Sequence, residues 1–264
     1  MGEIGMCTAT LLEDPMAAGP DELRGAAEAA AEAGCTELSV WGFQLAAMGD
    51  LDALGLRVAV VEAAMTWPAG DPKPEADQIV SLAASVGASK IVAVTMEPTL
   101  PDLDRARENL GVLVDLAASA GAQVCVEFLP WSGIPDLATA WRLVEPLGPD
   151  AGILLDTWHW VRQPGGPAVE LLRTIPGERI GYVQVCDAAA GASDDVLDEA
   201  MTSRLLPGEG VVDFAEVFAV LGEIGASPFV ATEIFNPGLV AEQGPVGAAM
   251  AMVDAATACG AGRL

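Results

Sequence analysis

The sequence predicts a single (β/α)₈ TIM barrel, in which eight parallel strands alternate with helices around a closed ring. Short apolar runs alternate with alanine-rich helical stretches from one end of the 264 residues to the other. The runs are rich in valine, isoleucine and leucine without strict polar alternation, which is typical of parallel strands covered on both faces. Eight such units match a barrel of about 250 residues. No linker or shift in composition divides the sequence, so we expect one domain over residues 1–264.

The expected strands and helices follow one another in regular order. The strands are expected at Ile4–Thr8, Glu37–Trp41, Arg57–Glu62, Lys90–Met96, Gln123–Leu129, Gly152–Thr157, Ile180–Asp187 and Phe229–Phe235. The helices are expected at Asp21–Ala33, Pro74–Val86, Asp104–Ala120, Pro135–Leu147, Gly166–Thr174, Asp213–Ile224 and Pro245–Ala258. Asp21 and Asp213 occupy N-cap positions, and Pro135 fits the first turn of its helix. Three helices are followed by glycine as the C′ residue, namely Gly87, Gly121 and Gly225.

An open, doubly wound sheet is the alternative fold. That fold usually carries a glycine-rich phosphate-binding loop after its first strand. The sequence contains neither a GxGxxG nor a Walker motif. We therefore favour the closed barrel.

The charge of the chain argues against two classes of partner. The 38 acidic and 12 basic residues give a net charge of −26 at pH 7. Such a surface repels phosphodiester backbones and anionic lipid headgroups, so we expect no nucleic-acid and no membrane partner. The apolar runs also fall well short of the about 20 residues that a membrane-spanning helix needs.

The cysteine pattern indicates a reducing compartment. The five cysteines are widely spaced and form no CxxC pair: Cys7, Cys35, Cys125, Cys186 and Cys259. The first ten residues lack the basic and apolar regions of a signal peptide. We therefore expect a cytoplasmic protein with free thiols. The sequence leaves the oligomeric state open, a homo-oligomer included.

Polar side chains stand at the carboxyl ends of the later strands, where barrels of this kind build their active sites. Glu127, Asp156 and Glu233 interrupt apolar strands, and Gln184 has the matching position on the seventh strand. Glu62 closes the third strand. Buried carboxylates need a counter-charge, and these segments contain few basic residues. Because oxygen ligands favour Mn²⁺ or Mg²⁺, we predict a divalent metal, to which Gln184 would offer a carbonyl oxygen.

A histidine and several tryptophans lie near the same strand ends. His159 is the only histidine and follows Asp156 closely. A neutral imidazole there would donate a hydrogen bond to a substrate or carry a proton near neutral pH, and a structural role is the alternative. Five tryptophans lie at or just beyond strand ends: Trp41, Trp67, Trp131, Trp158 and Trp160. They predict either a wall that stacks on a ring substrate or hydrophobic packing at the barrel mouth.

The order of these residues resembles a known family. A glutamate ends the fifth strand, DTxH the sixth, a polar residue the seventh and a glutamate the eighth, with R-x-x-PGEG before the last. This pattern is similar to the xylose isomerase-like TIM-barrel superfamily, in its sugar phosphate isomerase/epimerase branch of ketose 3-epimerases and inosose isomerases and dehydratases. The resemblance implies metal ligands at Glu127, Asp156, Gln184 and Glu233. It also implies substrate contacts from His159 and from Arg204, which precedes the turn Pro207–Gly210. The family normally has histidine where this chain has Gln184.

The resemblance implies an isomerase or epimerase that removes a proton next to a carbonyl through an enediolate. Glu127 and Glu233 would act as bases, and His159 would be a further catalytic group. The metal would be Mn²⁺ or Mg²⁺, with Co²⁺ and Zn²⁺ as alternatives. The strand ends carry no lysine and no arginine pair. We therefore expect an unphosphorylated keto-sugar or cyclitol as the substrate.

Other functions stay open at this point. A lyase would pass through the same enediolate and eliminate a hydroxyl from an inosose- or dehydroshikimate-like ring, or act on a 3-keto glycoside. A metal-free, non-catalytic barrel is a further alternative, because an amide oxygen is a weaker ligand than imidazole. The DNA-repair chemistry of the related endonuclease IV branch is excluded, because it needs a histidine-rich multi-zinc site and the chain has one histidine.

Overall fold

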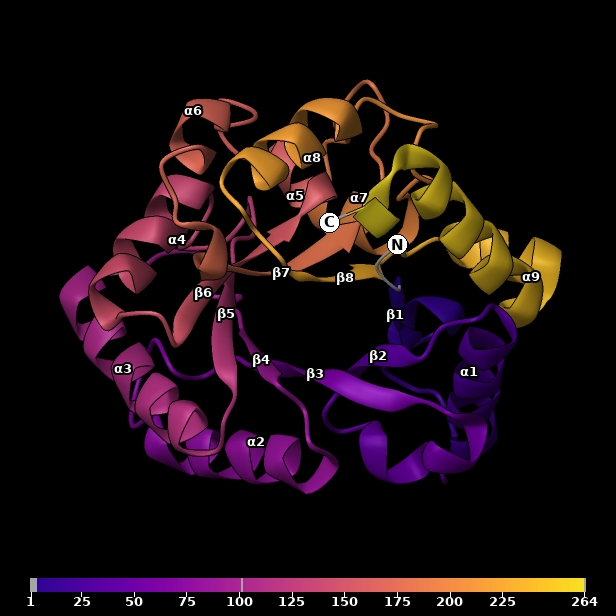
Figure 1. The fold of residues 1–264 in the computed structure, drawn as a ribbon, viewed down its shortest axis with the longest axis horizontal. Helices are drawn as coiled ribbons and strands as arrows, with labels where there is room; N and C mark the ends of the chain where they lie inside the picture. Colours follow the sequence, from indigo (N-terminus) through magenta and orange to yellow (C-terminus); the bar gives the residue numbers. More distant parts are fainter. Residues whose placement is uncertain (1–3, 101, 264) are drawn as a thin grey trace.

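The computed structural model describes residues 4–100 and 102–263, and its strands form a closed barrel (Figure 1). Neighbouring strands pair in parallel in chain order, and β8 pairs with β1. The strands are β1 (Gly5–Cys7), β2 (Glu37–Trp41), β3 (Arg57–Ala64), β4 (Lys90–Ala93), β5 (Gln123–Glu127), β6 (Ala151–Asp156), β7 (Ile180–Val185) and β8 (Phe229–Thr232). The predicted barrel is confirmed, and every predicted strand overlaps an observed one.

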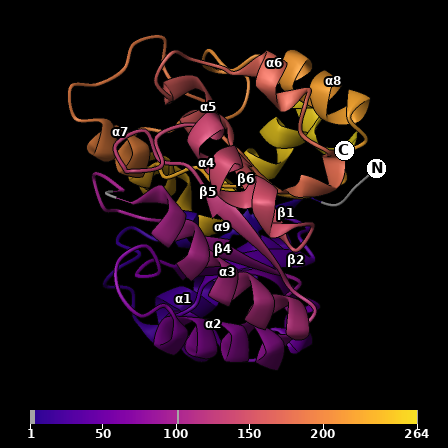
Figure 2. The same cartoon turned by 90° about the vertical axis from the view of Figure 1, so that its left-hand side faces the viewer.

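Helices surround the ring of strands, and Figure 2 shows α3 and α4 in front of β5 and β6. The α-helices of the described residues are α1 (Pro20–Glu32), α2 (Lys73–Val86), α3 (Leu103–Ser119), α4 (Leu137–Val144), α5 (Thr157–Arg162), α6 (Val169–Leu172), α7 (Val196–Thr202), α8 (Phe214–Glu223) and α9 (Pro237–Cys259). The 3₁₀ segments are η1 (Thr8–Leu11), η2 (Leu45–Ala47), η3 (Asp52–Leu54), η4 (Glu145–Leu147), η5 (Gly177–Arg179) and η6 (Ala261–Arg263). Among the residues described, no helix is both long enough and apolar enough to cross a bilayer.

Two of the three predicted residues at helix starts do not have the predicted position, because other residues cap these helices. Gly19 is the N-cap of α1, so Asp21 lies in the first helical turn instead. The side chain of Asp136 caps α4, which leaves Pro135 outside the helix. Asp213 caps α8 as predicted. The three predicted C′ glycines all have a left-handed backbone: Gly87, Gly121 and Gly225.

The later part of the chain contains helices that the sequence pattern did not predict. α5 follows β6 directly, and α7 lies in the long connection between β7 and α8. α9 is longer than the predicted helix and contains a break at Gly244, before Pro245. Both unpredicted helices are short, so neither contains enough turns to show a clear period of 3.6 residues.

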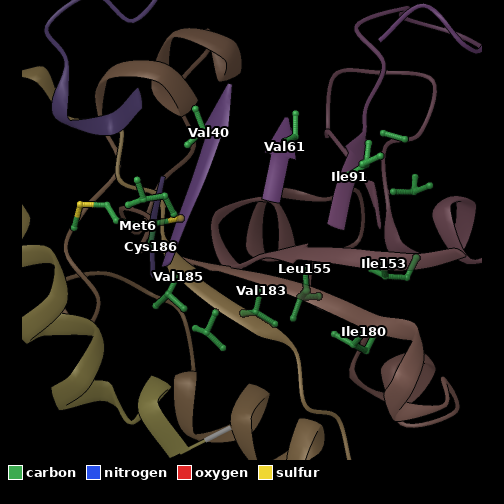
Figure 3. Packing of buried hydrophobic residues seen from close by; sticks show 14 of the residues in the cluster. Met6, Val40, Val61, Ile91, Ile153, Leu155, Ile180, Val183, Val185 and Cys186 are labelled. Atoms are coloured by element: carbon green, nitrogen blue, oxygen red, sulfur yellow. The ribbon is translucent and has the colours of Figure 1, made fainter. Parts of the chain in front are cut away.

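Strand side chains form two layers, one outside and one inside the barrel. The outer layer packs between the strands and the helices, and in Figure 3 Val40 and Val61 point one way while Val183 points the opposite way. The inner layer consists of the alternate strand positions, among them Val92 and Leu154. Both layers are almost free of solvent, as expected for a filled barrel.

The same alternation carries polar side chains into the barrel at its carboxyl end. Successive inward positions are Cys125 and Glu127 on β5, Leu154 and Asp156 on β6, and Tyr182 and Gln184 on β7. The register between β6 and β7 shifts near Gly181, where a Cβ atom would come within 2.6 Å of the Cys125 Sγ. Glycine permits this shift, after which Asp156 lies beside Gln184.

Candidate active site

Glu127 and His159 form one polar contact at the barrel mouth. His159 Nε2 lies 3.2 Å from Glu127 Oε1, and only 1% of the histidine and 9% of the glutamate are exposed. The rings of Trp131 and Trp158 meet the imidazole edge-on. The His159 Nδ1 is buried and has no hydrogen-bond partner among the described residues. It is therefore the ring atom left to serve a ligand.

Asp156 orients both the histidine and an arginine. Its Oδ1 accepts hydrogen bonds from the backbone N–H groups of Trp158, at 2.7 Å, and His159, at 3.0 Å, and so caps α5. Its Oδ2 lies 2.5 Å from Arg204 Nη1. Burial raises the pKa of Asp156, but the charge of Arg204 and these hydrogen bonds outweigh burial and keep it below its ordinary value. Asp156 is therefore ionised.

Arg204 is buried and joins two carboxylates. Its Nη1 also lies 3.2 Å from Glu233 Oε2, while its Nε donates to the carbonyl of Ala200 at 2.8 Å. Only 2% of the arginine is exposed. The guanidinium is thus fixed between β6 and the end of β8, as expected for a charge-assisted pair in a dry site.

Asp187 holds the loop that carries this arginine. Its Oδ2 accepts from the N–H groups of Gly208 and Gly210, each at 2.9 Å, and its Oδ1 from Val212 at 2.9 Å and Ala188 at 2.8 Å. A single buried carboxylate therefore closes the PGEG turn. The predicted strand ended at Asp187, but nothing local in the sequence indicated these partners.

Gln184 links two further glutamates. Its Nε2 donates to Glu233 Oε1 at 2.8 Å and lies 3.3 Å from Glu62 Oε1. Glu62 also accepts hydrogen bonds from the hydroxyl groups of Ser39 and, at 3.4 Å, Tyr182. The Oε1 of Gln184 is buried without a hydrogen-bond partner in the described part of the chain.

The glutamates of this group are hard to ionise. Burial and then the charge of Glu127 raise the pKa of Glu62 to about 7. Burial and then the charge of Glu62 raise the pKa of Glu233 well above its ordinary value. In both cases burial opposes ionisation most, and a cation beside these carboxylates would favour their charged form.

The chemistry of the donors fits a divalent cation. Glu127, Asp156 and Glu233 offer carboxylate oxygens, and Gln184 offers an amide oxygen that has no partner among the described residues. The side chains fall into two separate groups, and within each group the ligand atoms lie within 4.8 Å of one another. Glu127 and Asp156 gather with His159, whereas Glu233 gathers with Cys7 and Glu62.

The five tryptophans differ in exposure. Trp41 and Trp131 are partly exposed, and the Trp41 ring lies 5.9 Å from that of the exposed Phe43. The other three are almost fully buried in the hydrophobic core: Trp67, Trp158 and Trp160. Their burial favours packing over stacking on a ligand. Of these five tryptophans, Trp41 and Trp131 are the two whose side chains are accessible to a ligand at the mouth.

The sequence did not indicate a site role for three residues that lie around Glu62 and Glu233, namely Cys7, Ser39 and Tyr182. Cys7 and Ser39 lie on β1 and β2 and pair in register, and Tyr182 precedes Gln184 by two positions. Inward alternation on β7 was the available signal for Tyr182. β1 contains only three residues, which is too short for such a pattern.

Comparison with known proteins identifies the family of the chain. The sequence profile of the xylose isomerase-like TIM barrel family matches residues 27–256. A 3-dehydroshikimate dehydratase of Pseudomonas putida is 32% identical over 133 residues, 50% of this chain and 20% of that protein. An inosose dehydratase of Serratia proteamaculans is 28% identical over 144 residues, 49% of this chain and 46% of that protein. The aligned segments thus span less than half the length of these two relatives.

Solved structures agree on the fold. The IolI protein with a bound zinc atom has a TM-score of 0.81 and 20% identity, covering 97% of both chains. A D-allulose 3-epimerase of Methylomonas sp. has a TM-score of 0.72 and 20% identity, covering 98% of both chains. At this identity the likeness shows the shared barrel.

Proposed function

Since the chain belongs to the xylose isomerase-like TIM-barrel family, we propose that it is an enzyme that removes a proton next to a carbonyl of an unphosphorylated keto-sugar or cyclitol. Return of the proton to the opposite face of the carbon epimerises the substrate, and return to the neighbouring carbon isomerises it. The observation that supports this best is a pair of buried carboxylates, Glu127 and Glu233, from strands three apart around the barrel mouth.

The two carboxylates have different partners, which suits two proton-transfer roles. Glu127 contacts His159, which would pass on or return the proton that Glu127 takes. Glu233 has a raised pKa and would deliver a proton from the other side. Glu127 and Glu233, with Asp156 and Gln184, are also the residues that would hold the metal. When bound, Mn²⁺ or Mg²⁺ supplies a Lewis acid that stabilises negative charge on substrate oxygens.

The surroundings of the site favour a neutral substrate. Lys90 begins β4, at the far end of the barrel from the mouth, and Lys73 pairs with Asp77 on the surface. Arg204 is already bound by two carboxylates, so it leaves little charge for a phosphate. In this proposal Arg204 and His159 contact the substrate, and the rings of Trp41 and Trp131 stack on it.

A lyase is the second candidate, and one observation favours it. Elimination needs an acid for the departing hydroxyl, and the buried Nδ1 of His159 is without a partner among the residues described. Relatives of the chain are named 3-dehydroshikimate dehydratase and inosose dehydratase. Both reactions begin with removal of the same kind of proton, so Glu127 would serve either.

Proton exchange with solvent tests the proposal. The purified protein with Mn²⁺ is incubated in D₂O with unphosphorylated ketoses and inososes and followed by ¹H NMR. We expect deuterium next to the carbonyl together with an epimer or isomer, whereas a lyase produces a conjugated enone that absorbs in the ultraviolet. Glu127→Gln should slow the exchange by about 10²-fold or more, because the base is lost.

Glu108→Gln is the matched control, since Glu108 is an exposed carboxylate on α3, and it should exchange at the wild-type rate. Absence of both deuterium and enone with every substrate of the panel would support the non-catalytic barrel instead.

A further inference from the structure

A thiol lies beside two glutamates on the β3 side of the barrel mouth. The ligand atoms of Cys7, Glu62 and Glu233 all lie within 4.8 Å of one another. Cys7 is fully buried, and Glu62 and Glu233 are 7% and 4% exposed. Among the described residues, the side chains that donate to Glu62 are the hydroxyl groups of Ser39 and Tyr182 and the amide of Gln184. This group therefore gathers negative charge with incomplete compensation.

Gln184 supplies an independent sign of a ligand in the same place. Its amide lies against both Glu62 and Glu233, and its Oε1 is fully buried without a partner in the described part of the chain. A buried amide oxygen without a partner costs free energy. A half-turn of the terminal amide would exchange its nitrogen for this oxygen and direct Oε1 between the two glutamates. A cation there would satisfy all of these acceptors.

We propose that Cys7, Glu62 and Glu233 bind a divalent cation of borderline softness, Zn²⁺ or Co²⁺, with the amide oxygen of Gln184 as the fourth ligand. A thiolate ligand favours these ions over Mg²⁺ and Mn²⁺. As the sulfur–metal bond forms, the Cys7 thiol loses its proton to solvent, so binding releases protons. This site goes beyond the proposed function and shares Glu233 and Gln184 with the oxygen-donor set there.

Asp156 is less available for such an ion than Glu62. Both of its oxygens already accept strong bonds, one from the first turn of α5 and one from Arg204. Glu62 has no ion-pair partner among the described residues. Glu233 also contacts Arg204, at 3.2 Å, but its other oxygen faces the Gln184 amide beside Glu62.

Cobalt reports the thiolate directly. Co²⁺ is titrated into the chelator-treated protein without substrate, and the near-ultraviolet thiolate-to-cobalt charge-transfer band is recorded. We expect a saturable band in the wild type and its loss in Cys7→Ser, with affinity at least about tenfold lower. Cys125→Ser is the matched control, because Cys125 is also buried inside the barrel but lies near Gln123 at its other end. That variant should keep the band.

Glu62→Gln gives a second test on a different ligand. It should keep the thiolate band and weaken Co²⁺ binding by about tenfold, because a charged ligand is lost. Far-ultraviolet circular dichroism verifies that each variant is folded. Binding of Co²⁺ to the wild type without a thiolate band, no binding at all, or a band that persists in folded Cys7→Ser overturns the proposal. The band is read without turnover, so this site and the proposed function can fail separately.

Discussion

Gln184 shows how one side chain serves different needs in the barrel. Its amide nitrogen donates to Glu62 and Glu233, and its oxygen has no hydrogen-bond partner in residues 4–100 and 102–263. A histidine, which the family normally has here, offers one nitrogen lone pair to a metal when neutral. An amide offers an oxygen, which suits harder cations but binds transition metals less tightly. The choice of residue therefore affects the charge balance of the glutamates and would affect which ion the proposed site prefers.

Substitution of Gln184 tests whether it is a metal ligand. We expect Gln184→His to keep or raise the affinity for Mn²⁺, because imidazole binds this ion at least as well as an amide. We expect Gln184→Leu to lower it by about tenfold or more, because a ligand is lost. Calorimetric titration of Mn²⁺ into the metal-free proteins measures both, with the exposed Gln78→Leu as a control. Equal affinities in all four proteins would leave Gln184 as a packing or substrate-contacting residue.

At the scale of elements, what could be predicted follows from local pattern. Glu127 and Asp156 were placed at the mouth because alternation along a strand and the barrel architecture decide where a strand-end side chain points. The partners of these residues could not be predicted in this way. Arg204 reaches Asp156 across 48 residues, and Asp187 accepts from a turn more than twenty residues later. Such pairs depend on how loops pack, and the local periodicity of apolar residues contains no information on that packing.

The loop between β7 and α8 should depend on Asp187. In Asp187→Asn an amide nitrogen replaces one of the oxygens that accept from Gly208, Gly210 and Val212, so at least one buried N–H loses its partner. We expect a loss of about 2–4 kcal/mol in the free energy of unfolding, measured by urea denaturation. Amide hydrogen exchange at Gly208 and Gly210 should quicken.

Asp213→Asn is the control for this change, because asparagine caps a helix about as well as aspartate and the cost at α8 should stay within about 0.5 kcal/mol. If the two variants are equally stable, the PGEG turn is held by other contacts.

At the scale of the whole molecule, excess negative charge acts against the folded state. The chain carries −26 overall, and its barrel mouth buries four carboxylates, of which Asp156 and Glu233 contact the guanidinium of Arg204 and Glu62 and Glu127 do not pair with it. The surface part of this charge is screened by water and salt, whereas the buried part is not. The buried carboxylates therefore lower the stability of the folded protein, and a cation bound beside them would reduce this cost.

This cost should depend on pH through Glu62. In the folded protein, burial and then the charge of Glu127 raise the pKa of Glu62 from 4.5 to about 7. Between these two values the folded state binds more protons than the unfolded state, so stability falls as pH rises through that window. In metal-free protein with a chelator present, Glu62→Gln should match the wild type near pH 5 and exceed its free energy of unfolding by about 1–3 kcal/mol near pH 8. Urea denaturation at a series of pH values measures this difference.

Comparison of the two proteins removes effects that they share. Repulsion among the surface carboxylates weakens both as pH rises, and it cancels in the difference because the variant changes one charge among many. Burial and then the charge of Glu62 raise the pKa of Glu233. Removal of the Glu62 charge therefore also removes its repulsion of Glu233, which further stabilises the variant at high pH. A difference that stays constant from pH 5 to pH 8 would mean that Glu62 is already ionised at the lower pH. In that case the hydrogen bonds from Ser39, Tyr182 and Gln184 would stabilise its charge fully without a cation.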